Sequence, residues 1–197
     1  MDNAYIDELC KKVQEALKDD YNRFKHSIGV ANTAACLAMR YNSSMERAYI
    51  AGLLHDCAKC VPDDIKIEEC KRANLSISEI EYKSPYLLHS KLGALYAKEK
   101  YNIDDKEICS AIEYHTTGKP DMSILEKIIF IADYIEPYRN KAWDVDIIRG
   151  LAFEDINEAV YFCLKDTLEY LESSNKDIDE MTSKAYAYYA SNRLENI

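Results

Sequence analysis

The chain has 197 residues, 48% of them hydrophobic, and its 35 acidic and 25 basic side chains give a net charge of −10. That length fits one compact domain with a sizeable hydrophobic core. A surface this acidic repels the phosphates of a nucleic acid and of an anionic membrane, so we expect neither partner. A small phosphorylated ligand stays compatible, because the local charge at a site can differ from the global balance.

The start of the sequence does not resemble a targeting segment, because "MDNAYIDELC" is acidic and lacks the basic and apolar stretches of a signal peptide. The most apolar stretch, "KIIFIADYI", is too short to span a bilayer. The seven cysteines are an odd number and are dispersed along the chain, which favours reduced thiols. We therefore predict a cytoplasmic protein.

Helical periodicity runs through nearly the whole sequence, since apolar residues recur at intervals of three and four and alternating patterns are almost absent. The four prolines fall where helices should begin or end. Ser43 and Ser44 mark one N-terminal cap region, and Asp104 and Asp121 are placed to cap the helices that follow them. We predict an all-α fold with helices at 3–18, 22–41, 44–59, 62–73, 77–82, 86–101, 104–115, 122–136, 144–173 and 177–195.

The four histidines and one aspartate stand out by their positions. Each lies on the apolar face of a different predicted helix: His26, His55, His89, His115 and Asp133. A single core histidine usually just donates to a backbone carbonyl, but five polar groups that all point inward each need a partner. A shared metal centre would satisfy all five. Imidazole and carboxylate ligands suit iron, manganese, zinc and related first-row ions.

The adjacent His55 and Asp56, in the segment "AGLLHDCAKC", favour a site for two ions. Neighbours on a helix diverge by about 100°, so Asp56 can point between two ions while His55 binds one of them. Two ions about 3.5–4 Å apart can share a hydroxide and hold a phosphoryl group during in-line displacement. We assign the first ion to His26, His55, Asp56 and Asp133, and the second to Asp56, His89 and His115.

This pattern resembles the HD-domain phosphohydrolase superfamily, which carries a histidine, an "HD" pair and a distant aspartate in that order, here His26, 55–56 and Asp133. The additional His89 and His115 resemble its two-metal members. The resemblance implies a helical bundle with a two-metal site in its core.

A narrower resemblance covers residues 20–190. The segments "RFKHSIGVANTA", "AGLLHDCAK", "LLHSKLGA", "AIEYHTTG" and "EKIIFIADYIEPYR" closely resemble the YqeK-type symmetrical bis(5'-nucleosyl)-tetraphosphatases of bacteria. That family hydrolyses diadenosine tetraphosphate into two ADP and is described as using a di-iron centre. The resemblance implies a single HD domain over 1–197, with a metal-binding core at about 20–140 and C-terminal helices at about 144–195.

Roles for individual residues also follow from the resemblance. It implies that the metal ligands are His26, His55, Asp56, His89, His115 and Asp133. It assigns catalysis to Asp56, Lys59 and Arg23. It assigns nucleotide binding to Arg23, His26, Lys59, His89, His115, Thr116, Asp133 and Arg139.

The spacing of the cationic and hydroxyl residues agrees with these roles. Arg23 and Lys59 each lie one helical turn from a candidate ligand, and Thr116 directly follows another. Arg139 lies in a short loop beyond Asp133. Three of these features have an ordinary alternative: a solvated side chain for Lys59 and for Arg139, and a helix C-cap for the "HTTG" segment.

Two other features have alternatives of their own. Cys57 and Cys60 form a C-x-x-C that could bind zinc or cycle between redox states, but no second such pair follows, which favours reduced structural thiols. The 16 tyrosines include "YAYY" at 186–189, which fits core packing better than a stacking platform for adenine.

We predict a metal-dependent hydrolase in which a metal-bound hydroxide attacks a phosphorus of the polyphosphate while Arg23, Lys59 and Arg139 offset the developing charge. Two divalent ions are expected, iron by the resemblance, with manganese or cobalt compatible with the ligands. Three alternatives stay open: an HD-type phosphohydrolase or phosphodiesterase acting on other nucleotides, a di-iron oxygenase, and a nucleotide sensor without catalysis. The oligomeric state is open, with a homodimer among the options.

Overall fold

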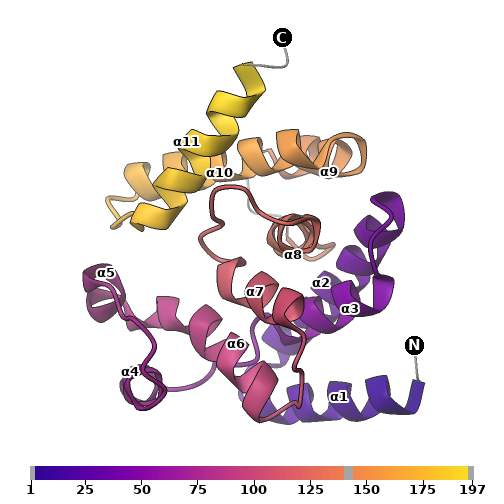
Figure 1. The fold of residues 1–197 in the computed structure, drawn as a ribbon, viewed down its shortest axis with the longest axis vertical. Helices are drawn as coiled ribbons and strands as arrows, with labels where there is room; N and C mark the ends of the chain where they lie inside the picture. The colour runs from indigo at the N-terminus through magenta and orange to yellow at the C-terminus, as the bar shows by residue number, and fades with distance from the viewer. Residues whose placement is uncertain (1–2, 140–143, 195–197) are drawn as a thin grey trace.

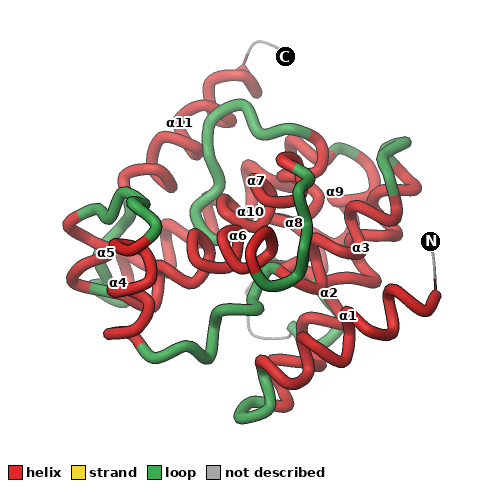
Figure 2. Tube along the Cα trace, turned by 60° about the horizontal axis from the view of Figure 1, so that its bottom comes forward, coloured by secondary structure: helices red, strands yellow, loops and turns green. Residues whose placement is uncertain are grey.

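The computed structural model describes residues 3–139 and 144–194. Over those residues the chain forms helices joined by loops and has no strand, which confirms the all-α class (Figure 2). In the same part of the chain, no helix combines the length and the apolar character needed to cross a membrane. The elements are α1 (Asn3–Ala16), α2 (Tyr21–Arg40), α3 (Met45–Leu54), α4 (Asp63–Arg72), α5 (Glu79–Lys83), the 3₁₀ helix η1 (Pro85–Leu88), α6 (His89–Glu99), α7 (Lys106–Tyr114), α8 (Ile124–Ile135), α9 (Val145–Glu154), α10 (Ile156–Ser173) and α11 (Glu180–Leu194).

Helix α8 lies at the centre of the bundle. Its sequence, ILEKIIFIADYI, is apolar on almost every side, and a helix of that kind has to be enclosed by others. Helices α2, α3 and α7 pack on one side of it and α9 and α10 on the other (Figure 1). Asp133, near the end of this helix, is therefore carried into the middle of the molecule.

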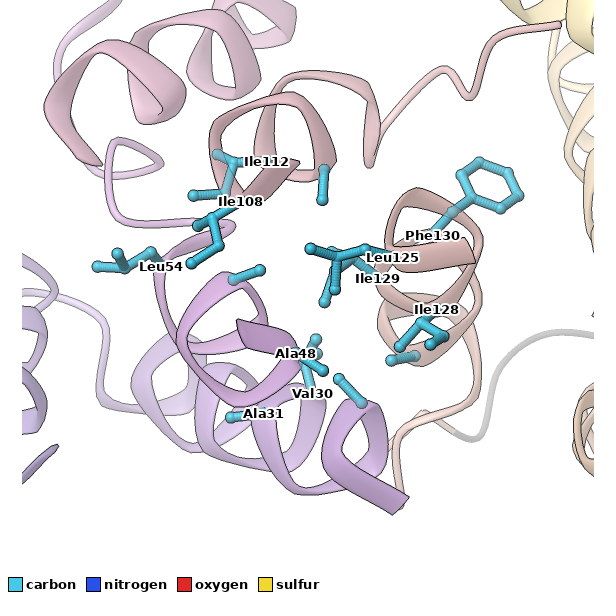
Figure 3. Packing of buried hydrophobic residues seen from close by; sticks show 14 of the residues in the cluster. Val30, Ala31, Ala48, Leu54, Ile108, Ile112, Leu125, Ile128, Ile129 and Phe130 are labelled. Atoms are coloured by element: carbon cyan, nitrogen blue, oxygen red, sulfur yellow. The ribbon is translucent and has the colours of Figure 1, made fainter. Parts of the chain in front are cut away.

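An apolar cluster joins the helices that surround the centre. Figure 3 shows side chains of α7 and α8 meeting those of α2 and α3 in one packed group. Removing this apolar surface from water is the main favourable contribution to the stability of such a bundle. The fully buried members include Val30, Ala31, Ala48, Leu54, Ile112, Ile128 and Ile129.

Helices α2 and α3 approach each other closely at Gly52. A Cβ atom on Gly52 would lie 2.8 Å from the Cα atom of Ala31 and 3.2 Å from the carbonyl carbon of Val30. Real Cβ atoms do not come that near to a backbone, so the contact needs a residue without one. The close approach brings His26 of α2 beside His55, which follows α3.

Several predicted helix boundaries are wrong. The helix predicted at 44–59 ends at Leu54, because the following residues form turns in which the Cys57 N–H bonds to the Leu54 carbonyl at 3.0 Å. The helix predicted at 144–173 is two helices. Asp155 leaves the helical conformation, with φ −141° and ψ 107°, and caps α10 by accepting bonds from two backbone N–H groups.

The helix predicted at 86–101 starts as a 3₁₀ turn after a proline, so α6 begins only at His89. Of the predicted caps, Ser44 is confirmed at α3. Asp104 and Asp121 are wrong, because the neighbouring polar residues Asp105 and Ser123 accept the capping bonds instead. The boundary predicted between the core and the C-terminal helices falls on residues 140–143, which lie outside the described residues.

We expect Gly52→Ala to lower the free energy of unfolding by about 1–3 kcal/mol, because the new methyl group forces α2 and α3 apart. The matched control is Gly150→Ala in α9, where nothing lies within 4 Å of the added atom. That control should raise stability by about 0.5–1 kcal/mol through helix propensity. Urea unfolding followed by circular dichroism measures both, and equal effects would contradict the close packing at Gly52.

Candidate metal centre

Six side chains from five parts of the fold converge beside α8. His26 lies within α2 and Asp133 within α8, whereas the other four lie at helix ends. His55 and His115 follow the last residues of α3 and α7, and His89 begins α6. In the described part of the chain, three groups have ligand atoms within 4.8 Å of one another: His26, His55 and Asp56; His55, His115 and Asp133; and Asp56, His89 and His115.

The second of these groups was not predicted from the sequence. It places His115 close to His55 and Asp133, which we had assigned to the first ion, whereas His115 was assigned to the second. The ring centres of His55 and His115 are 4.9 Å apart. The six residues therefore form one continuous cluster. The two ends that the sequence predicted are still distinct, with His26 and Asp133 at one and His89 at the other.

The histidine rings are held so that their Nε2 atoms all point toward the centre of the cluster. Nδ1 of His55, His89 and His115 each lies 2.6–2.7 Å from the backbone carbonyl three residues earlier in the chain. A carbonyl only accepts, so each Nδ1 carries the proton and donates it. Each Nε2 is then left with a lone pair, and all four Nε2 atoms lie at the centre, with that of His26 3.3 Å from that of His55.

Asp56 lies between the two ends of the cluster. Its Oδ2 atom accepts a hydrogen bond of 2.8 Å from Nη1 of Arg23 and lies 3.5 Å from Nε2 of His55. Its Oδ1 atom lies 3.2 Å from Nε2 of His89 and 3.6 Å from Nε2 of His115. One carboxylate oxygen thus faces each end, which is the placement that a bridging ligand requires.

The Oδ1 atom of Asp56 gives a direct test of whether this cluster fits a metal ion. It is buried and has no hydrogen-bond partner among the described residues, although two imidazole nitrogens are near. Because their Nδ1 atoms carry the protons, the nearby nitrogens present lone pairs to a carboxylate oxygen. Such an arrangement is repulsive unless a cation lies between them. The Lys59 ammonium, 3.6 Å from Oδ1, is too far for a hydrogen bond, so this buried oxygen is left without a close partner. The imidazole and carboxylate donors fit a divalent metal ion, which is the kind of ion that HD-domain hydrolases use.

The protonation states of His89, Asp56 and Asp133 also suit metal binding; for His26, burial lowers the pKa but the carboxylates of Asp133 and Glu136 outweigh it and raise the pKa. Burial lowers the pKa of His89 to about 4, so that its ring is neutral at physiological pH. Burial alone would raise the pKa of Asp56, but the histidines around it hold that pKa well below the usual range. His26 and Arg139 hold the pKa of Asp133 well below its usual range in the same way, against the effect of burial. Neutral imidazoles and ionised carboxylates are the forms that bind metals.

The four other predicted residues all border the cluster. Nη2 of Arg139 lies 2.7 Å from Oδ1 of Asp133, and Arg23 pairs with Asp56 as described. The ammonium of Lys59 is 3.0 Å from Nε2 of His89, and the Thr116 hydroxyl is 3.3 Å from the same atom. Three cations and a hydroxyl at the rim of a carboxylate–imidazole cluster form a surface suited to an anionic ligand.

The tyrosines and Gly118 behave as their ordinary alternatives predict, whereas Lys59 and Arg139 do not, because they pair with the cluster. Cys57 is buried, burial raises the pKa of its thiol to about 12, and neither it nor Cys60 joins a described metal group or a disulfide. Tyr189 is buried and its hydroxyl accepts a bond from a backbone N–H. Tyr186 stacks on Tyr161 with ring centres 5.6 Å apart, so these tyrosines pack the C-terminal helices. Gly118 has φ +64° and its N–H closes the end of α7.

Two residues of the site were missed by the sequence reasoning. Glu136 is buried and its carboxylate lies 3.1 Å from Nδ1 of His26, a partner 110 residues away in the chain. Arg149 of α9 donates to the carbonyls of Ile135, Glu136 and Arg139 and so holds the loop after α8. The one local signal for Glu136 is an acidic residue directly after an apolar helix, which usually marks a solvated end.

Comparison with known proteins places this geometry in a class. The HD domain family model matches residues 23–138, so the chain is an HD-domain protein. The symmetrical bis(5'-nucleosyl)-tetraphosphatase of Halalkalibacterium halodurans is 39% identical over 84% of this chain and 87% of that protein. The protein of the same name from Bacillus subtilis is 36% identical over 86% of this chain and 90% of its own length.

A solved structure has the same fold and belongs to the same superfamily. The crystal structure of a predicted HD superfamily hydrolase involved in NAD metabolism, from Clostridium acetobutylicum, aligns with a TM-score of 0.90 at 40% identity. It covers 95% of this chain and 97% of the other. Within the HD-domain proteins, this chain belongs to the family of symmetrical bis(5'-nucleosyl)-tetraphosphatases.

We expect Asp56→Asn to lower the amount of divalent metal bound per chain, because the amide removes the charge that faces both ends of the cluster. The matched control is Asp105→Asn at the opposite end of α7 from His115, where asparagine also caps a helix. Metal analysis of the anaerobically purified full chain measures both. Wild-type metal content in Asp56→Asn would contradict the assignment of this cluster.

Proposed function

We propose that this chain is a metal-dependent hydrolase that splits dinucleoside tetraphosphates symmetrically, releasing two ADP from diadenosine tetraphosphate. The observation that supports this most is the cluster of four imidazoles and two carboxylates bordered by Arg23, Lys59 and Arg139. A polyphosphate needs cations along its length, and this rim supplies them next to a metal centre. The relatives that bear the name of this activity align over most of the chain.

We further propose that the ligands are the six clustered residues and that they hold two ions. Bound divalent ions would supply Lewis-acid charge to the phosphoryl oxygens and lower the pKa of water. The two separate oxygen positions of Asp56 support a pair of ions rather than one. The donors are imidazole and carboxylate without thiolate, so iron, manganese and cobalt all suit them, and iron is our first choice.

The chain's own side chains then bind and orient the polyphosphate. Nη1 of Arg23 donates to Asp56 and fixes the guanidinium beside the cluster, while the side chain stays 29% exposed, so its accessible N–H groups can donate to a phosphate oxygen. Lys59 lies at the His89 end and Arg139 at the Asp133 end, so the cations flank both sides of the cluster. Fixed cations of this kind stabilise the charge that develops on the phosphoryl group.

The first test is the product pattern of the anaerobically purified full chain with diadenosine tetraphosphate. We expect ADP as the sole product, separated by ion-exchange chromatography, because symmetrical cleavage yields two identical halves. AMP with ATP would contradict symmetrical cleavage. Turnover of other nucleotides with none of diadenosine tetraphosphate would favour the broader HD-type phosphohydrolase.

We expect Arg139→Ala to lower kcat/KM for diadenosine tetraphosphate by about 10- to 100-fold, the equivalent of a charged hydrogen bond of 1.5–3 kcal/mol. The matched control is Arg193→Ala, which removes another arginine paired with a carboxylate, in α11 and with Glu158 as its partner. Steady-state kinetics measure both. An equal loss in the two variants would show that Arg139 acts through general stability.

A further inference from the structure

His26 differs from the other three histidines in the partner of its Nδ1 atom. Their Nδ1 atoms face neutral backbone carbonyls, whereas Nδ1 of His26 faces the carboxylate of Glu136, with 3.1 Å between the nitrogen and Oε1. A carboxylate that accepts this proton fixes the ring and makes the opposite nitrogen a stronger donor to a metal. The two ends of the cluster are therefore built differently.

Glu136 is held firmly in this position. Its side chain is only 2% exposed, and its second oxygen, Oε2, accepts a bond of 2.8 Å from the backbone N–H of Tyr138. Its own N–H bonds to the Ala132 carbonyl, and its carbonyl accepts from Arg149. Both carboxylate oxygens and both backbone groups thus have partners, so the carboxylate cannot turn away from the histidine without losing bonds.

Gly29 makes the space that the carboxylate occupies. A Cβ atom on this residue would lie 2.5 Å from Oε2 and 3.4 Å from Cδ of Glu136. Gly29 lies one helical turn after His26 in α2. A glycine inside a helix costs about 0.5–1 kcal/mol relative to alanine, and here it leaves room for a side chain from the loop after α8. The packing of α2 therefore supports the same contact independently of the hydrogen bond.

Charge also separates the two ends. Asp133 and Glu136 both lie at the His26 end, where Arg139 and Arg23 offset part of their charge. The His89 end has no carboxylate of its own among the clustered residues, shares only Asp56, and has the ammonium of Lys59 beside it. A cation is therefore attracted more strongly to the His26 end.

We infer that Glu136, seated against Gly29, is a positioning residue that orients His26 and makes the His26 end the tighter of two metal positions. This inference rests on the proposed metal-dependent function. Metal affinity can be measured without any substrate, so the two proposals can fail separately.

The test is a titration of the chelator-treated full chain with cobalt(II), followed by calorimetry and by visible absorption. The wild type should bind in two steps of different affinity. Glu136→Gln should weaken the tighter step by about 10- to 100-fold and change the other far less. Glutamine keeps the size of the side chain, but it has one acceptor oxygen for two donors, the His26 ring and the Tyr138 N–H.

Gly29→Ala is the second variant, because it displaces the same carboxylate without changing it. It should weaken the same tighter step, both in the calorimetric titration and in the titration followed by visible absorption. The matched control is Glu126→Gln, a buried glutamate within α8, which caps that helix and contacts Ser110 and Lys119. Gly150→Ala is the control for the added methyl group. Both controls should leave the two steps unchanged.

Three outcomes would overturn the inference: a single wild-type step, an unchanged tighter step in Glu136→Gln, or an equal weakening of both steps in that variant. If the wild type hydrolyses diadenosine tetraphosphate but Glu136→Gln binds cobalt normally, only the positioning role fails. If the tighter step weakens as expected but no dinucleoside tetraphosphate is hydrolysed, only the proposed function fails.

Discussion

The structure depends on how four imidazoles and two carboxylates are kept together inside a helical bundle. Each of these groups would be costly to bury alone, and burying them together requires a defined direction for every proton. Three backbone carbonyls and one carboxylate take the Nδ1 protons, so all the Nε2 lone pairs meet at the centre. The result is an arrangement of acceptors around Asp56 that a cation completes.

The bundle supplies this arrangement mainly through the ends of its helices. His55 and His115 lie just past the last turns of α3 and α7, where side chains can reach the carbonyls of the turn before them. Helix ends also leave backbone groups free that the helix interior would use. The close approach of α2 and α3 at Gly52 then brings these ends within reach of His26.

The C-terminal helices contribute to the site although they carry none of the six clustered residues. Arg149 of α9 holds three carbonyls of the loop that bears Glu136 and Arg139. Arg40 of α2 in turn bonds to the carbonyls at the end of α9. These contacts connect the loop at the rim of the cluster to both sides of the bundle, so α9 supports the residues at that rim.

The sequence alone determined the helical class, the six converging residues and the family, because apolar periodicity and the order of His and Asp residues are local properties of the chain. It also indicated Arg23, Lys59, Thr116 and Arg139, which are near candidate ligands in sequence. It did not reveal Glu136 or Arg149, because their partners are distant in the chain. It also did not reveal the break at Asp155, because the apolar periodicity continues across that residue. Glu136 meets His26 across 110 residues, and only the packing of α2 against the loop after α8 brings the two together. Contacts of that kind are decided by tertiary structure.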